Sequence, residues 1–203
     1  MGKNDQSIDA ALLERARNGE PAAHAALYRA FSAMVYTLAY RMLGSKAAAE
    51  DVLQDSFVEI IRKAADFRGD GDIRGWIKRI AINKALSHLR SPWIAKRSGA
   101  IDGHTPAHAN GSVAGNVDEN SRRLGLQQEL ERALAALSTT ARAIVWLHDV
   151  EGYTHGEIGR LMGRSTSFSK SQLARAYREL RELLQPHETD EGSEPCLGVL
   201  KTV

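Results

Sequence analysis

The stretch Phe67–Arg90, FRGDGDIRGWIKRIAINKALSHLR, is the most informative part of this 203-residue chain. Its pattern predicts a short polar loop with two glycines, followed by a helix that is both apolar and basic. From Phe67 to Ala100 there are eight lysines and arginines but two acidic residues, in a chain of net charge +2. Positive charge concentrated among aromatic residues is typical of a nucleic-acid surface, although an ordinary solvated helix face can have the same composition.

Within this stretch, Asp72 is placed to cap the helix that follows. The residues expected on its apolar side are Ile73, Trp76, Ile77 and Ile80. The cations that must share the remaining surface are Arg74, Lys78, Arg79 and Lys84. Asn83 carries both donors and acceptors, so it is suited either to reading a base edge or to a structural amide role.

Composition limits the class of protein. Alanine, leucine, arginine and glutamate dominate, aromatic residues make up 6%, and no β-branched run alternates, so we expect an all-α chain. The single cysteine, Cys196, cannot form an internal disulfide, which favours a reducing, cytoplasmic location. We find no signal peptide and no apolar stretch near the ~20 residues that a membrane span needs.

Residues that favour the ends of helices divide the chain before this stretch into helical segments. Ser7 and Gly19 are expected to bound a first helix, Pro21 to begin a second that runs to Leu43, and Gly44 to end it. Ser45 should cap a third helix over about residues 46–66. The expected core stripe of that third helix is Val52, Leu53, Phe57, Ile60, Ile61 and Ala64.

The opposite face of the third helix is acidic. Asp51, Asp55 and Glu59 follow one another at i+4 spacing, with Glu50 and Gln54 beside them. Like charges at this spacing cost a few tenths of a kcal/mol per pair, which suggests a basic partner. The alternative is purely structural, because acids are favoured near a helix N-terminus and Arg62 and Lys63 lie at the favourable opposite end.

Helical periodicity stops between Ser91 and about Arg123, where Gly, Ala, Asn and Ser dominate, and this predicts a flexible linker between two domains. His104 and His108 lie in it without a further metal ligand, so we expect no metal site. The expected organisation is a first domain over 7–92, a linker over 93–123, a second domain over 124–185 and a disordered tail over 186–203.

The second domain repeats the helical pattern from about Leu124, with Leu126, Leu130, Ala133, Leu134 and Leu137 on its apolar side. Ser138 should cap a helix over about 139–150, and Thr154 with Glu157 forms a capping-box pattern before a short helix that ends at Gly163. A turn over 164–167 leads into a longer helix to about Leu184. Its expected core residues are Leu173, Ala176, Tyr177, Leu180 and Leu183, and its exposed cations are Lys170, Arg175 and Arg178. This is a helix-turn-helix pattern, although a plain helical hairpin looks similar.

The two halves together resemble the extracytoplasmic-function (ECF) sigma factors of bacterial RNA polymerase. AEDVLQDSF (Ala49–Phe57) is similar to the family's polymerase-binding helix, and FRGDGDIRGWIKRIAIN (Phe67–Asn83) to its −10 promoter segment. HDVEGYTHGEIGRLMG followed by SKSQLARAYRELREL resembles its −35-binding helix-turn-helix. The resemblance covers about 24–90 and 126–184, with an unmatched linker between them.

The resemblance implies a role for each surface. The residues that would dock on the basic clamp helices of the largest polymerase subunit are Glu50, Asp51, Gln54 and Asp55. Those that would bind the melted −10 element and its flipped base are Phe67, Arg68, Asp70, Arg74, Trp76, Lys78, Arg79, Asn83 and Lys84. Those that would contact the −35 element are Arg164, Ser165, Ser167, Lys170, Ser171 and Arg175, with Arg164 on a phosphate. An anti-sigma partner is also implied.

Some residues depart from the family pattern. Ala48 stands where an acid is usual, which would weaken polymerase binding, and Ser138 stands where proline is frequent. Ser167, Phe168 and Ser169 stand where Gly-Thr-Val is typical. A serine at position 167 is strained if φ is positive there, and Phe168 is expected in the core rather than on DNA.

Two other classes of function were considered. A dimeric helix-turn-helix regulator of duplex DNA would need neither the acidic face nor a single-strand pocket. A metal-dependent nuclease could use Asp51, Asp55 and Glu59, but no further ligand completes such a site. The chain has no P-loop, no G-x-S-x-G and no CxxC, so we expect neither catalysis nor a cofactor.

Overall fold

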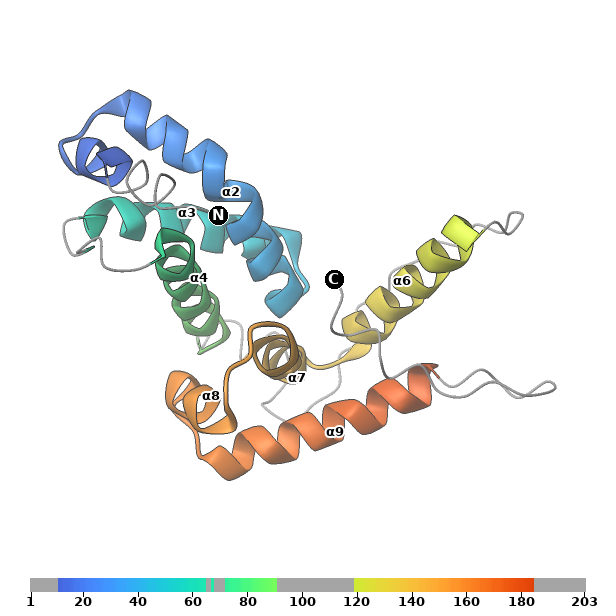
Figure 1. Cartoon of the computed structure of the whole chain (residues 1–203). Coiled ribbons are helices and arrows are strands. Elements are labelled where there is room, and N and C mark those ends of the chain that lie inside the picture. Colours follow the sequence, from blue (N-terminus) through green and yellow to red (C-terminus); the bar gives the residue numbers. More distant parts are fainter. Residues whose placement is uncertain (1–10, 65–66, 68–71, 91–118, 185–203) are drawn as a thin grey trace. The chain divides into compact units, whose positions relative to one another are not determined.

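The computed structural model describes residues 11–64, 67, 72–90 and 119–184, with the side chains of the last range described from Gly125 onward. The chain divides into two compact units, Met1–Ser91 and Pro92–Val203 (Figure 1). Every regular element among the described residues is a helix, and the all-α prediction is confirmed. The histidines at 104 and 108, Cys196 and most of the expected linker lie outside the described residues.

The first helices of unit 1 have the predicted bounds at Gly19, Pro21 and Gly44, whereas the start expected at Ser7 lies outside the described residues. Residues 11–17 are helical, and Gly19 ends this segment with φ 79°. Helix α2 spans Pro21–Leu43, with proline in its first turn. Gly44 ends α2 in the left-handed conformation, with φ 67°, and donates its N–H to the carbonyl of Tyr40. Glycine adopts this conformation without the steric cost that a side chain adds.

Helix α3 spans Lys46–Arg62, and the Ser45 hydroxyl accepts the N–H of Ala48 at 3.4 Å. The helix was expected to continue to about residue 66, and this was wrong: Lys63 already leaves the helical conformation, with φ −95° and ψ 5°. Helix α4 spans Ile73–Arg90. Asp72 caps it as predicted, because its two carboxylate oxygens accept the N–H groups of Arg74 and Gly75 at 3.0 and 3.2 Å.

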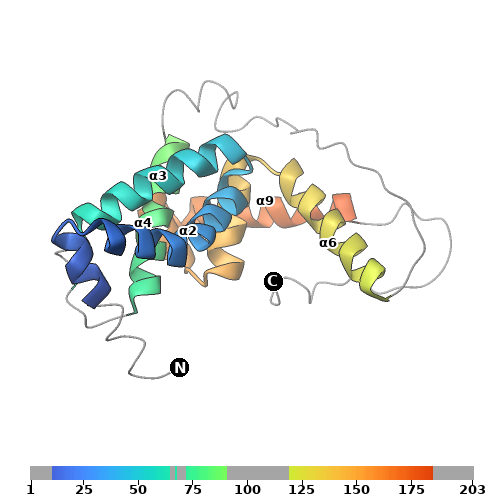
Figure 2. The ribbon, with the colours of Figure 1, turned by 90° about the horizontal axis from the view of Figure 1, so that it is seen from above.

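Helices α2, α3 and α4 pack against one another around one apolar core (Figure 2). The large side chains at its centre are Leu27, Val35, Met42, Ile60, Ile77, Ile82 and Leu86. Of the stripe predicted on α3, Val52, Phe57, Ile60 and Ala64 are buried, whereas Leu53 and Ile61 are half-buried. The acidic face of α3 and the basic side of α4 are therefore carried by a rigid three-helix scaffold.

The first described helix of unit 2 is α6, Glu119–Ala136, which starts before the expected Leu124. Ser138 caps α7, Thr139–Val145, by accepting the N–H of Ala141 at 3.2 Å. The helix expected over 139–150 does extend to Val150, but its last five residues, Trp146–Val150, form a π-helical turn, η2. Helix α8, His155–Met162, has the predicted Thr154–Glu157 capping box and ends at Gly163, with φ 65°. Helix α9 spans Thr166–Leu184 and so begins inside the expected 164–167 turn.

The core of unit 2 is built from α7, η2, α8 and α9, with α6 packed on α9. Its large buried side chains are Leu137, Ile144, Leu147, Ile158, Leu173 and Leu180. Leu126 and Leu183 were expected in this core, but they are 56% and 50% exposed. In Figures 1 and 2 the N-terminal end of α6 projects away from α7–α9, in agreement with the exposure of Leu126. Within the described ranges, no helix is both long and apolar enough to cross a bilayer.

Candidate polymerase and nucleic-acid interfaces

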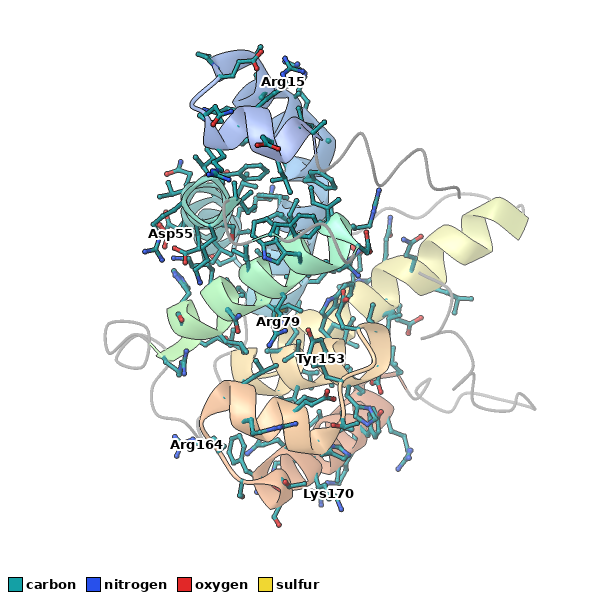
Figure 3. All side chains as sticks on the ribbon, turned by 60° about the vertical axis from the view of Figure 1, so that its left-hand side comes forward. Arg15, Asp55, Arg79, Tyr153, Arg164 and Lys170 are labelled. Carbon is teal, nitrogen blue, oxygen red and sulfur yellow. The ribbon has the colours of Figure 1, made fainter. Side chains whose placement is uncertain are left out.

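The acidic face of α3 is open to solvent. Glu50, Asp51, Gln54 and Asp55 are all exposed, and Figure 3 shows Asp55 on the outer side of the helix. Val58 continues the same face, one turn further on, and is 67% exposed. An exposed apolar side chain bordered by polar groups is common at protein interfaces. Sequence periodicity gave no sign of this role for Val58, because Val58 lies outside the expected core stripe.

Glu59, which was expected to continue the acidic face, belongs to a different group. Its side chain is only 14% exposed, and its carboxylate lies 2.6 Å from Arg62, 3.0 Å from Lys63 and 3.7 Å from Lys84. Hydrogen bonds from Arg62 and then Lys63 lower the pKa of Glu59 to about 2. Glu59 is therefore neutralised by its own chain, and the acidic surface offered to a partner is formed by Glu50, Asp51 and Asp55.

The start of α4 carries the aromatic part of the basic stretch. Phe67 and Trp76 are both half-buried, and their rings are tilted by 54° with centroids 5.4 Å apart. The predicted contacts Arg68 and Asp70 lie outside the described residues. The described residues that flank these two predicted contacts are Phe67, which pairs with Trp76, and the capping residue Asp72.

The cations on the basic side of α4 differ in how far they are exposed to solvent. Arg74, Arg79 and Asn83 are exposed, as expected of residues that contact a nucleic acid. Lys78 is half-buried, and the Lys84 ammonium lies 3.7 Å from Glu59 with its side chain 31% exposed. Lys84 thus stands between an internal carboxylate and the surface, which sequence spacing could not reveal because Glu59 is on another helix.

Gly159 determines how closely α8 approaches the turn before α9. A Cβ atom at this position would lie 2.9 Å from the Arg164 carbonyl oxygen and 3.1 Å from the carbonyl carbon of Ser165. The Arg164 N–H donates to the Gly159 carbonyl at 2.8 Å. This tight pairing of helix and turn is what makes the predicted helix-turn-helix compact. The sequence analysis did not single out Gly159, although a glycine inside a short helix is a signal for close packing.

The turn also sets the start of the recognition helix α9. The Ser165 hydroxyl accepts the N–H of Phe168 at 3.1 Å and caps α9. Ser167 lies in the first helical turn, so the strain expected for a positive φ does not arise. Phe168 is only half-buried, and the Arg164 guanidinium lies 5.6 Å from the centre of its ring. The prediction that Phe168 lies in the core is therefore met in part.

The outer side of α9 presents the predicted −35 contacts. Ser167, Lys170, Ser171 and Arg175 are all exposed, and the Ser171 hydroxyl donates to the Phe168 carbonyl at 3.0 Å. Figure 3 shows Arg164 and Lys170 directed away from the body of their unit. Together with Arg178, which is also exposed, these residues give α9 a cationic outer side.

A buried arginine that the sequence analysis missed supports this motif. Arg142 is 8% exposed and donates to the carbonyls of Leu134, Ala135 and Leu137 at 2.8, 2.6 and 3.1 Å. It therefore satisfies the last carbonyls of α6 and ties this helix to α7. Among the described residues, no group of three or more potential ligands could hold a metal ion.

Comparison with known families matches these two units separately. The Sigma-70 region 2 model matches residues 27–93, and the Sigma-70, region 4 model matches residues 127–180. The chain belongs to the ECF sigma factors. The matched ranges contain α3 and α4 in the first case and the helix-turn-helix of α8 and α9 in the second, so the resemblance seen in the sequence is confirmed.

Curated relatives agree with this family. The chain is 29% identical over 164 residues to the ECF RNA polymerase sigma factor SigE of Mycolicibacterium smegmatis, covering 81% of this chain but 62% of that protein. It is 26% identical over 185 residues to the RNA polymerase sigma-H factor of Pseudomonas aeruginosa, covering 89% and 96%. It is also 26% identical over 187 residues to the ECF RNA polymerase sigma-E factor of Escherichia coli K12, covering 90% and 97%.

Among solved structures, the chain resembles the sigma factor RpoE of Bartonella quintana, which was crystallised with the anti-sigma factor NepR. The TM-score is 0.50 at 21% identity, covering 79% of this chain and 96% of that one. This likeness concerns the fold, which it confirms as that of a sigma factor.

Proposed function

We propose that this ECF sigma factor binds core RNA polymerase, recognises the −35 and −10 promoter elements and promotes melting of the DNA. The observation that carries the proposal is the presence, in one chain, of an exposed acidic face on α3, a basic α4 and a cationic recognition helix α9. Each surface suits a different partner: basic protein helices, single-stranded DNA and duplex DNA.

The acidic face would contact the polymerase through Glu50, Asp51, Gln54 and Asp55, on the clamp helices of the largest subunit. Repulsion between these acids would be relieved by the basic partner. Val58 would add an apolar contact at the C-terminal end of this charged surface. Glu59 takes no direct part in this proposal because Arg62, Lys63 and Lys84 already surround it.

The −10 element would be held by the aromatic pair, the loop before α4 and the basic side of that helix. Phe67 and Trp76 offer ring surfaces for unpaired bases, and Arg74, Lys78, Arg79 and Lys84 would lie along the phosphates, with Asn83 near a base edge. Arg68 and Asp70 remain predicted contacts of the flipped base. On binding, a phosphate would replace Glu59 as the partner of Lys84.

The −35 element would lie in contact with Arg164, Lys170, Ser171 and Arg175, while Ser165 and Ser167 border the backbone at the start of α9. Replacing Arg175 with alanine should weaken binding to a matched −35 duplex by ~1–3 kcal/mol and relax the sequence preference at one position. Equal preference in wild type and variant, measured by fluorescence anisotropy against mutated duplexes, would remove Arg175 from the base contacts.

Run-off transcription is the test of the whole proposal. Core RNA polymerase is incubated with a genomic DNA library, with and without this chain, and the transcript start sites are sequenced. We expect defined starts that depend on the chain. Starts that are identical in its absence would favour the alternative, a helix-turn-helix regulator that binds duplex DNA without being a polymerase subunit. That alternative leaves the acidic face of α3 without a role.

Sigma factors are initiation factors rather than enzymes, and we extend this to the present chain, together with a cytoplasmic location where the polymerase works. Regulation by an anti-sigma factor is part of the same proposal. It is supported by the resemblance to a family in which such partners are common. A pull-down of the tagged chain from its native host would identify the partner.

A further inference from the structure

A polar cluster connects η2, the start of α8 and the recognition helix α9. The Tyr177 hydroxyl donates to Asp149 Oδ1 at 2.7 Å, and His148 Nδ1 lies 2.8 Å from the same oxygen. His155 Nδ1 lies 3.1 Å from Ser169 Oγ. The rings of His148 and His155 stack, with centroids 4.6 Å apart and planes 21° from parallel, so the three-residue group and the His155–Ser169 pair form one continuous cluster.

This cluster holds α9 at two points. Ser169 and Tyr177 both belong to α9 and are separated by about two helical turns. Ser169 is 0% exposed, and the next residue, Lys170, is a proposed −35 contact. Apolar packing around Leu173 also holds the helix, and directional hydrogen bonds at two levels further constrain both its rotation and its tilt. The polar cluster therefore sets the direction in which the DNA-facing side chains point.

The charge on His155 decides whether the cluster can persist. Burial, followed by the neighbouring His148 and Lys170, lowers the pKa of His155, and only Asp149 acts in the opposite direction. The groups that face His155 are thus His148 and Asp149 from η2, and Ser169 and Lys170 from α9. Two protonated rings stacked at 4.6 Å would repel, and the one carboxylate of Asp149 already bonds His148 and Tyr177.

The lowered pKa of His155 determines how the stability of the cluster depends on pH. The folded arrangement binds fewer protons at His155 than the unfolded chain does, so its stability is full above the ordinary histidine pKa of about 6.5. The stability falls as the pH drops below that value. Protonation also makes both ring nitrogens donors, so that Nδ1 can then only donate to Ser169 Oγ.

Building on the proposed −35 role, we propose that His148, Asp149, His155, Ser169 and Tyr177 position the recognition helix, and that protonation of His155 weakens −35 binding. Ser169 stands where the family typically has valine, which has no hydroxyl to contribute.

The test compares DNA binding at about pH 7.5 and about pH 5.5, one unit on either side of the ordinary histidine pKa. The probe is duplex DNA selected from a random pool with the full-length wild-type chain at the higher pH. Wild-type affinity should fall at the lower pH by up to about tenfold, which is the limit for one histidine proton at one pH unit below the ordinary pKa of about 6.5. His155→Asn places an amide where Nδ1 lies, so it should retain the affinity at high pH and lose the pH response.

Matched controls separate positioning from general effects of acid. His88→Asn removes a histidine of α4, outside the cluster, and should respond to pH as the wild type does. Ser169→Ala and Tyr177→Phe each delete one anchor and should lower affinity at the higher pH. An unchanged affinity in both, or a His155→Asn variant as pH-sensitive as the wild type, would overturn the proposal.

The thermal unfolding temperatures of the same full-length proteins test the cluster without any DNA, and so do not depend on the proposed −35 role. If selection yields no duplex, the −35 role fails, but the unfolding temperatures still decide whether the cluster titrates. A wild-type unfolding temperature that falls between the two pH values, with a smaller fall in His155→Asn, supports the positioning cluster. Equal falls in both proteins contradict it.

Discussion

Helices α4 and α9, the two to which DNA contacts are assigned, are held in place by different chemistry. All the buried residues of α4 are apolar, among them Ile73, Ile77 and Ile80. The buried residues of α9 include Ser169 and Gln172, and Tyr177 is hydrogen-bonded to Asp149. Apolar packing resists change in pH, whereas a polar cluster gives direction but depends on protonation. The −10 and −35 surfaces should therefore respond differently to the same change of conditions.

The largest expected effect is the loss of stability when the apolar packing of α4 is disrupted. Ile77 is 0% exposed, and Ile77→Ala should destabilise unit 1 by about 2–5 kcal/mol through lost burial and the cavity left behind. Urea unfolding followed by circular dichroism measures this cost. Val58→Ala is the matched control, because Val58 is 67% exposed, and should stay within about 0.5 kcal/mol of the wild type. Similar costs for both variants would show that α4 is not held by this core.

A smaller loss of stability is expected from crowding the contact between α8 and the turn before α9. Gly159→Ala would place a Cβ 2.9 Å from the backbone oxygen of Arg164, and the forced shift should cost about 1–3 kcal/mol. Gly156→Ala, in the same helix, meets its nearest atom at 4.0 Å and should be neutral or slightly stabilising. Calorimetry of the two variants at neutral pH makes the comparison. If both glycines tolerate alanine equally, α8 does not approach the turn as closely as the structure has it.

The smallest effect concerns Glu59, the acid that links α3 to α4. Its pKa of about 2 lies below the ordinary glutamate value, so its ion pairs stabilise the fold fully above about pH 4.5. This stabilisation is lost as the pH falls from there toward 2. Unfolding curves of wild type and Glu59→Gln should converge over that range and differ above it. A constant difference at every pH would mean that Glu59 acts through packing alone.

Local signals in the sequence predicted the helix ends well. Pro21 restricts its own φ, and Gly44 and Gly163 accept the left-handed conformation without steric cost. Ser45 and Asp72 cap helices with their own side chains. These effects act within a few residues, so they can be derived without knowing the tertiary structure.

Features that depend on neighbours far along the chain could not be predicted in this way. Periodicity placed Leu126 on an apolar face but could not tell that it is exposed. The i+4 spacing placed Glu59 beside Asp55 but could not show that Lys84 arrives from another helix. The π-helical turn at the end of α7 and the hydrogen bond between His155 and Ser169 likewise arise from the packing of α7, α8 and α9.

The most direct test of the account is binding of core RNA polymerase by a charge-reversed α3. In Asp51→Arg/Asp55→Arg, both substitutions lie on exposed positions, so the fold should persist, as checked by circular dichroism. The control Glu14→Arg/Glu129→Arg makes the same change in net charge at exposed positions away from this face. We expect the control to co-purify with core polymerase at moderate salt and the α3 variant to be lost. A folded α3 variant that binds as tightly as the control would contradict the assignment of this face to the polymerase.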